Sequence, residues 1–268
     1  MRYPLQRSPG SVYVLMLAAL LLLSGCVTTT ESEYGRADRQ QEIKSRVEAA
    51  NAYLQKGNTE QAIVHLKRAA EIDPDDPSIQ ATMAQVFWRS GEYELADEHF
   101  QRALRLNPEY SRGRNNYAAF LYERRRYADA ARELERVVAD TLYEGRATAF
   151  MNLGKVLLKL DRTADAEEAF TRAVRMDGRQ WQAMLELAEL HYARGDYRGA
   201  GRFYDQFKRY APSQAPESLL LGIRIARIEG DKNAEASYAL QLKSRFPESE
   251  AYRRYQTDRS LQAPADDK

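Results

Sequence analysis

The chain has 268 residues, of which 40 are lysine or arginine and 39 are aspartate or glutamate. A charge this balanced argues against a nucleic-acid-binding protein, which carries a basic patch. One cysteine and three scattered histidines (His65, His99 and His191) cannot form a disulfide framework and lack the spacing of metal ligands. We therefore expect no metal, no cofactor, no small-molecule substrate and no nucleic-acid partner.

Residues 1–25 have the pattern of a secretory signal peptide. Arg2 and Arg7 give a basic start without an acid, and the apolar run Val12–Leu23 follows. A transmembrane anchor is the alternative, but crossing a bilayer takes about 20 apolar residues and this run has twelve. A signal peptide is the better interpretation.

The only cysteine stands at the end of this segment. The order Leu23-Ser24-Gly25-Cys26 resembles the bacterial lipobox, whereas an ordinary signal peptide would leave the position of the cysteine unexplained. The resemblance implies that Cys26 is lipidated and becomes the first residue of the mature chain, held on a membrane by its acyl chains. Val27, in place of an aspartate, implies sorting to the periplasmic face of the outer membrane of a Gram-negative bacterium.

The next segment is polar. Thr28 to Gln41 contains hardly any apolar residue, so we expect residues 26–42 to form a flexible tether behind the lipid. The last ten residues, 259–268, have little to bury, and we expect a disordered tail there. Between them, alanine, leucine, glutamate, arginine and glutamine dominate, which favours helix, and no alternating β-branched stretch predicts a strand.

Residues 43–258 repeat with a period of thirty-four. Gly57 and Gly91 keep this interval, as do Ala62 and Ala96 in the same two units. The pattern resembles the tetratricopeptide repeat (TPR), in which each unit is a pair of antiparallel helices. The resemblance implies an all-α solenoid of about six repeats, a right-handed superhelix with a capping helix near 249–258. We assign the units to Ile43–Asp76, Pro77–Tyr110, Ser111–Glu144, Ala147–Gln180, Trp181–Gln214 and Ala215–Glu248.

Two departures from the period are informative. The interval from Ala130 to Ala166 is thirty-six, so two residues near Gly145-Arg146 are inserted, and a longer loop is expected there. In the sixth unit the turn glycine, Gly230, is displaced by one residue.

A TPR solenoid binds partners along the first helices of its units. No GxSxG, HExxH or Walker motif is present, so we expect no enzyme. An apolar, aromatic-bearing groove suits an amphipathic helix, and Trp88 and Tyr122 are the natural anchors. For each residue, simple packing against the next repeat is an equal alternative. The inward positions are Val47, Asn51, Leu54, Ala81, Gln85, Trp88, Arg89, Arg112, Asn115, Ala119, Tyr122, Met151, Lys155, Leu158, Leu185, Glu189, Tyr192, Leu219 and Ile223.

Two segments resemble one family in particular. Pro108–Tyr127, which includes Asn115, Asn116 and Tyr122, and Gly230–Tyr252 are similar to the type IV pilus pilotins, the PilF/PilW family of pilus biogenesis lipoproteins. In many members we expect a cysteine where Tyr122 stands and a glycine in place of Ala118.

The resemblance implies an outer-membrane lipoprotein that binds secretin subunits and promotes their localisation and multimerisation. The contacts that we expect to carry the interaction are Asn51, Gln85, Trp88, Arg89, Asn115, Asn116, Tyr122 and Met151. Two alternatives remain open from the sequence. One is a TPR lipoprotein adaptor that recruits periplasmic proteases or peptidoglycan enzymes, and the other is a scaffold in outer-membrane protein assembly.

Overall fold

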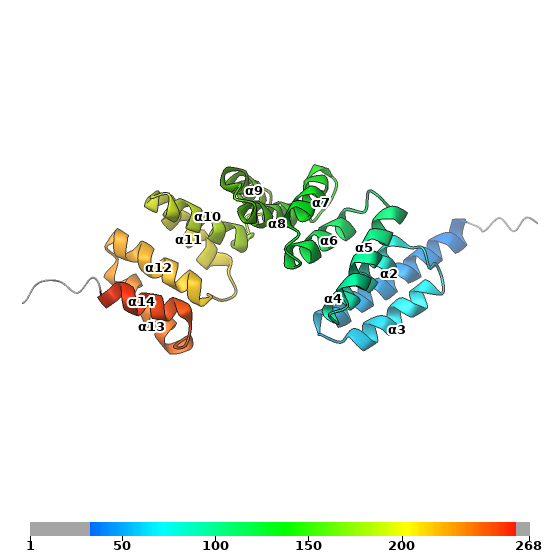
Figure 1. Ribbon diagram of the computed structural model, residues 1–268, viewed down its shortest axis with the longest axis horizontal. Coiled ribbons are helices and arrows are strands. Elements are labelled where there is room, and N and C mark those ends of the chain that lie inside the picture. The colour runs from blue at the N-terminus through cyan, green and yellow to red at the C-terminus, as the bar shows by residue number, and fades with distance from the viewer. Residues whose placement is uncertain (1–32, 261–268) are drawn as a thin grey trace, which may run out of the picture.

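A computed structural model describes residues 33–260, and these form thirteen α-helices and no strand. Figure 1 shows the helices as hairpins placed side by side in one curved row, with α2 and α3 at one end and α13 and α14 at the other. The helices are α2 (Glu33–Gln55), α3 (Thr59–Ala70), α4 (Pro77–Arg89), α5 (Tyr93–Leu106), α6 (Ser111–Glu123), α7 (Tyr127–Ala139), α8 (Arg146–Lys159), α9 (Thr163–Met176), α10 (Trp181–Ala193), α11 (Tyr197–Tyr210), α12 (Pro216–Glu229), α13 (Lys232–Arg245) and α14 (Glu250–Ser260).

The turn inside each hairpin has the same backbone geometry in all six units. A residue with positive φ follows the first helix, and the next N–H donates to the carbonyl five residues back, as in Asn58 to Tyr53 and Arg126 to Leu121, both 2.9 Å. Glycine adopts this left-handed conformation without strain. The six residues are Gly57, Gly91, Arg125, Asp161, Gly195 and Gly230, so two units close the turn without glycine.

Small residues mark where the two helices of a hairpin approach. Ala62, Ala96, Ala130, Ala166 and Ala200 recur on the second helices and are fully buried. Large side chains then fill the space between hairpins, Phe100 and Phe170 among them, each with no exposed surface. Four apolar clusters therefore follow one another along the row, because no hairpin can bury its apolar side chains alone.

The longer loop is confirmed. Residues 140–145 connect α7 and α8 and are two more than residues 107–110 and 177–180 after the second and fourth hairpins, whereas residues 71–76 after the first hairpin match them in length because α3 ends early. Leu142 projects from this loop and is 90% exposed. Ser111 on α6 donates to the Asp140 carboxylate at 2.6 Å, which ties the loop to its own hairpin.

The first helix is longer than expected. It begins at Glu33, so residues 33–42, which we expected to belong to the tether, are helical. Residues 35–42 are exposed, and Arg46 pairs with Glu42 one turn earlier at 2.6 Å, which supports the helix at this end. The expected signal peptide, the expected lipidation at Cys26 and the last eight residues of the expected tail lie outside the described part of the chain. Within residues 33–260, no helix has the length and hydropathy to cross a bilayer.

Candidate functional site

The first helices of the hairpins carry the candidate site. Residues at matching repeat positions, such as Gln85, Ala119, Lys155 and Glu189, line successive hollows on α4, α6, α8 and α10. We call the surface formed by α2, α4, α6, α8, α10 and α12 the inner surface. It contains three hollows.

The first hollow lies between α2, α4 and α6 and has a volume of about 770 Å³. Four expected contact residues meet there: Asn51, Gln85, Arg89 and Asn116. Their side chains make no hydrogen bond or ion pair to any other part of residues 33–260. The amides therefore have donors and acceptors free for a peptide backbone.

The second hollow is smaller, about 250 Å³, and more apolar. Trp88 and Tyr122 line it together with Ala119 and Val156, and Lys155 is the cation among its lining residues. The indole N–H of Trp88 donates to Glu123 at 2.7 Å, so that ring is held in place by its neighbour.

Ring contacts fix both aromatic side chains further. The Trp88 ring stands edge-on to Phe120 with centroids 5.7 Å apart, and the Tyr122 ring meets Tyr127 at 5.4 Å. A partner that inserts an apolar side chain here would find walls already ordered, which lowers the entropic cost of binding.

The third hollow, about 450 Å³, lies between α10, α12 and α14 and has acidic side chains. Glu189 is exposed on this hollow, and the protein around it displaces part of the water near its carboxyl. This loss of water and, to a smaller extent, the negative charges of Glu186 and Glu217 together raise the pKa of Glu189 to about 7. Burial also raises the pKa of Glu186, which Lys155 and Lys159 partly counteract.

The position of Glu189 was anticipated from the repeat, but the gathering of three carboxylates was not. Glu186 lies one turn before Glu189 on α10, and Glu217 lies in the first turn of α12 in the next unit. The signal lies in the repeat register, since Glu217 occupies the inner position that Ser78 holds in the second unit.

Comparisons with known proteins identify the fold and the family. Models described as TPR repeat and tetratricopeptide repeat match residues 50–91 and residues 82–147 and 151–215. The type IV pilus assembly protein PilF of Pseudomonas aeruginosa is 39% identical over 239 residues, covering 88% of this chain and 94% of that protein. The chain belongs to the PilF/PilW family of type IV pilus assembly proteins.

Solved structures agree with this assignment. PilF of Pseudomonas aeruginosa superposes with a TM-score of 0.79 at 40% identity, covering 82% of this chain and 99% of that one. PilW, a widely conserved type IV pilus biogenesis factor, gives a TM-score of 0.68 at 25% identity over 80% of this chain and 98% of its own. Like them, the chain is a helical TPR assembly factor of a non-enzymatic family.

In this PilF/PilW-family chain, two of the expected contact residues have other surroundings. Met151 is 5% exposed and packs in the core, because its position on α8 faces the neighbouring hairpins. Asn115 accepts a hydrogen bond from Asn152 at 3.1 Å and so connects α6 to α8. Only its neighbour Asn116 lines the first hollow.

Two further inward positions differ from the expectation. Leu219 and Ile223 are at most 1% exposed and belong to the core, whereas Leu54 and Ala81 are as deeply buried but do border the first hollow. In the sixth unit the cause is the displaced turn at Gly230, which shifts the inner positions by one residue. Leu220, Leu221 and Arg224 therefore line the third hollow instead.

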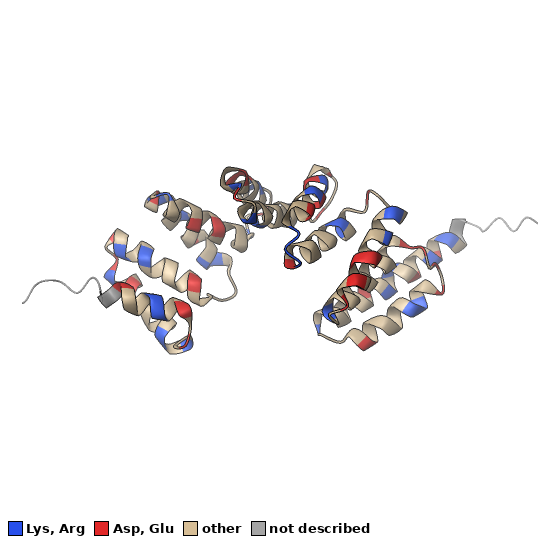
Figure 2. Ribbon diagram, viewed as in Figure 1, with Lys and Arg blue, Asp and Glu red and all other residues tan. Residues whose placement is uncertain are grey.

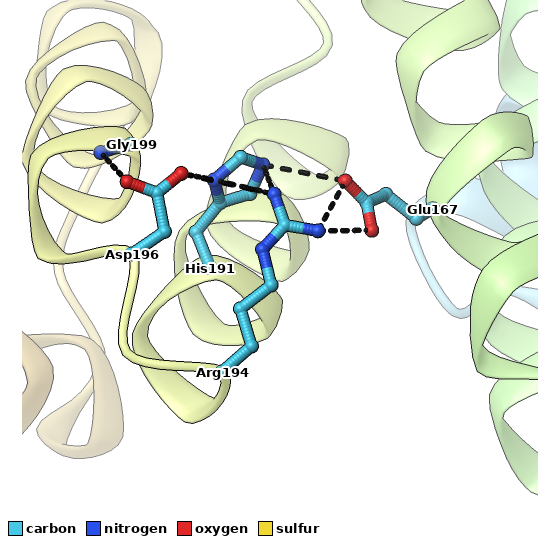
Figure 3. Close-up of polar contacts among 5 residues, drawn as sticks. All are labelled: Glu167, His191, Arg194, Asp196 and Gly199. Atoms are coloured by element: carbon cyan, nitrogen blue, oxygen red, sulfur yellow. Dashed lines mark hydrogen bonds and ion pairs between the residues drawn. The ribbon is translucent and has the colours of Figure 1, made fainter.

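A polar network fixes the junction between the fourth and fifth hairpins of this family member (Figure 3). The buried His191 ring has Asp196 at 2.7 Å from Nδ1 and Glu167 of α9 at 3.4 Å from Nε2. Arg194 pairs with Glu167 at 2.7 Å, and the Gly199 N–H donates to Asp196 at 2.9 Å. These contacts hold α10, and with it Glu189, against α9 and α11. Within residues 33–260, no three histidine, cysteine or acidic side chains could hold a metal ion together.

Proposed function

We propose that this chain is an outer-membrane lipoprotein pilotin, which binds secretin subunits through its TPR groove and promotes their localisation and multimerisation for type IV pilus assembly. The observation that carries the proposal is the pairing of the first two hollows on one inner surface, in a member of a type IV pilus assembly family. The pilotin role requires a surface that binds the secretin and a signal that targets the protein to the outer membrane.

The chemistry of the first two hollows supports secretin binding. Unengaged amides in the first hollow suit the backbone of an incoming segment, and the preordered rings of Trp88 and Tyr122 suit its apolar side chains. Since α4 and α6 contribute to both hollows, one segment can occupy them together. An amphipathic helix with apolar residues on one face fits this arrangement.

The sequence that precedes the helical solenoid supports targeting to the outer membrane. Cys26 follows the lipobox-like residues and precedes Val27, which together favour lipidation and export to the outer membrane. A single acyl chain gives only reversible membrane binding, whereas two or more give stable anchoring. Residues 27–32 then join the lipidated cysteine to α2.

The test is an immunoblot for heat-resistant secretin multimers in outer-membrane fractions. It compares the wild type, a deletion strain, Cys26→Ser and the double variant Trp88→Ala/Tyr122→Ala. We expect multimers to be lost in the deletion, misplaced to the inner membrane in Cys26→Ser, and reduced in the groove variant although the lipid is present. Tyr210→Ala, which removes a tyrosine that is 41% exposed at the end of α11, is the matched control and should leave multimers intact.

Other outcomes separate the alternatives. Unchanged multimers in both the deletion and Cys26→Ser would remove the pilotin role and favour an adaptor that recruits a periplasmic enzyme. Loss of multimers in Cys26→Ser but not in the groove variant would support the role of the lipid and place the secretin-binding surface elsewhere on the protein. Equal melting temperatures of the purified variants ensure that the readout reports binding.

A further inference from the structure

The outer surface of the solenoid has an unbalanced charge in its fourth to sixth units. The second helices of the hairpins, α3, α5, α7, α9, α11 and α13, form this surface. Along α11, Arg198, Arg202 and Arg209 follow one another at helical spacing, so they lie on one face. Helices α9 and α13 carry cations at matching repeat positions. We call the following six side chains the basic surface: Arg175, Arg198, Arg202, Arg209, Lys232 and Lys243.

These six cations have no internal partner. All are exposed, and within residues 33–260 none of their side chains makes an ion pair or a hydrogen bond. Every acidic side chain of α9, α11 and α13 is already paired at 2.5–2.9 Å: Asp165 with Arg162, Glu167 with Arg194, Glu168 with Arg172, Asp205 with Lys208 and Glu235 with Arg227. Asp177 and Asp231, in the adjoining turns, accept hydrogen bonds from backbone N–H groups. Positive charge therefore remains in excess, and it acts on anions within a Debye length of about 8 Å at physiological salt.

The excess is local, because another part of the outer surface has the opposite sign. Glu94 and Glu98 of α5 occupy the repeat positions that Arg198 and Arg202 hold in α11. Neither glutamate pairs with a cation in the described part of the chain, and Figure 2 shows acidic bands along α5. Since the formal net charge of the whole chain is only +1, the basic surface arises from segregation of charge.

The guanidinium groups of this surface suit phosphate. Arg202 and Arg209 line one hollow of about 400 Å³ together with the amide of Gln206. A planar guanidinium donates two parallel hydrogen bonds to the oxygens of a phosphate group, which makes arginine a strong ligand for it.

Exposed apolar side chains accompany the cations and separate two classes of anionic partner. Leu240 on α13 is 65% exposed, and Met176 at the end of α9 is 47% exposed. Apolar groups beside arginine and lysine are typical of surfaces that lie in the headgroup region of a bilayer, where the apolar groups enter the acyl boundary. An acidic protein segment would neutralise the cations but leave Leu240 and Met176 beside carboxylates. The spread of the cations over three helices also suits a broad anionic surface better than a single chain.

We propose that the basic surface docks on the phosphate headgroups of an anionic phospholipid bilayer. The presence of a nearby bilayer rests on the proposed function, in which acyl chains on Cys26 supply it; the charge of the surface does not. Residues 27–32 reach at most about 20 Å when extended, so the anchor would hold the helices at a high effective concentration next to the membrane. Docking through the second helices would leave the first helices, which carry the secretin hollows, facing away from the bilayer.

The test measures energy transfer from a dye on the lipidated protein to an acceptor on the lipid headgroups of vesicles. The vesicles contain phosphatidylcholine alone or phosphatidylcholine with anionic phosphatidylglycerol. With Cys26 acylated, Ala236→Cys provides the one free thiol for the dye, on α13 between Lys232 and Lys243. We expect transfer to rise on the anionic vesicles and to fall back in about 1 M salt, where the Debye length is about 3 Å. Val64→Cys, at the matching repeat position on α3, should show no such rise.

Charge variants locate the surface. Each cation beside an anionic membrane favours the docked state by a factor of about five, so Arg198→Gln/Arg202→Gln/Arg209→Gln should lower the ratio of docked to undocked protein on the order of a hundredfold. The matched control is Lys67→Gln/Arg68→Gln/Arg105→Gln, which removes the same charge from exposed residues of α3 and α5 and should leave docking unchanged. Equal melting temperatures of the two triple variants ensure that folding is not the cause.

Three results would overturn the proposal. The first is equal transfer on the two kinds of vesicle, and the second is an equal loss of docking in both triple variants. The third is transfer that does not differ between the vesicles while a polyglutamate peptide binds through the three arginines, which would assign the surface to an acidic protein instead. Protein mass, which reports acylation, and secretin multimers test the proposed function separately. Docking without multimer dependence removes the pilotin role alone, whereas multimers without docking remove the membrane contact alone.

Discussion

Replacing Arg125 by glycine should stabilise the solenoid. Arg125 has φ of 58° at the turn between α6 and α7, in the place where Gly57, Gly91 and Gly195 stand in other units. A side chain in this left-handed region costs about 1–2 kcal/mol relative to the ordinary conformation. Glycine avoids that cost, but it also gives the unfolded chain more conformational freedom. This greater entropy of the unfolded state lowers the stability by roughly 0.5–1 kcal/mol.

The net expectation is about 0.5–1 kcal/mol of added stability. Arg125 is exposed, and its side chain makes no ion pair or hydrogen bond to the rest of residues 33–260, so its removal sacrifices no contact there. For a chain of this size, each kcal/mol raises the melting temperature by about 2–4 °C. Asp161→Gly, at φ of 57° in the next unit, should give a similar gain.

Urea unfolding followed by circular dichroism measures the effect. The double variant Arg125→Gly/Asp161→Gly should combine the two gains to within about 0.5 kcal/mol, because the turns belong to different hairpins. The reverse change, Gly91→Ala, should lower the free energy of unfolding by about 1 kcal/mol, because alanine is strained at a φ of 79°. Steric contact is not the reason, since a Cβ there would meet nothing within 4 Å. The control is Ser90→Gly, at φ of −80°, which should destabilise slightly. If Arg125→Gly and Ser90→Gly lower the stability equally, strain at the turn is not the cause.

Three further predictions concern packing and charge. Arg114→Ala should cost about 3–5 kcal/mol in urea unfolding, because it leaves the Glu133 carboxylate unpaired in a mostly buried site; a loss below about 1 kcal/mol would contradict this. Gly199→Ala should lower the stability by about 1–3 kcal/mol, because the added methyl would collide with the His191 ring; an unchanged melting temperature would refute the close approach. Glu189→Gln should gain stability relative to the wild type as the pH rises from about 4.5 to about 7, because the folded state holds the Glu189 proton over a range in which the unfolded state has released it. Parallel stability curves for Glu189→Gln and the wild type across that range would show that the surroundings do not raise this pKa.

The repeat period was enough to define most of the fold. Alanines at a fixed interval mark the close approach of paired helices, and a glycine at four of the six turns marks the positive φ that follows the first helix. The inserted residues near Gly145 gave the longer loop, because each unit must return the chain to the same stacking position. The turns at Arg125 and Asp161 follow from the repeat even though neither residue favours them.

The surroundings of side chains at the inner surface were harder to predict from the sequence. The helical period separates an apolar face from a polar one, but it does not say how closely the next hairpin covers a boundary residue. Met151 shows the limit, since its position is covered by neighbouring helices. Leu219 and Ile223 show another, because one displaced glycine moves the inner face of the sixth unit by one residue.

The sequence by itself determined the helical hairpins, their number and their turns, because these depend on local propensity and on contacts repeated at a fixed spacing. Only the tertiary structure decided that Glu186, Glu189 and Glu217 share one neighbourhood and that Trp88 and Tyr122 border one hollow. Such neighbourhoods depend on how successive hairpins are rotated against each other. That rotation comes from the summed packing of many side chains, and no local pattern in the chain records it.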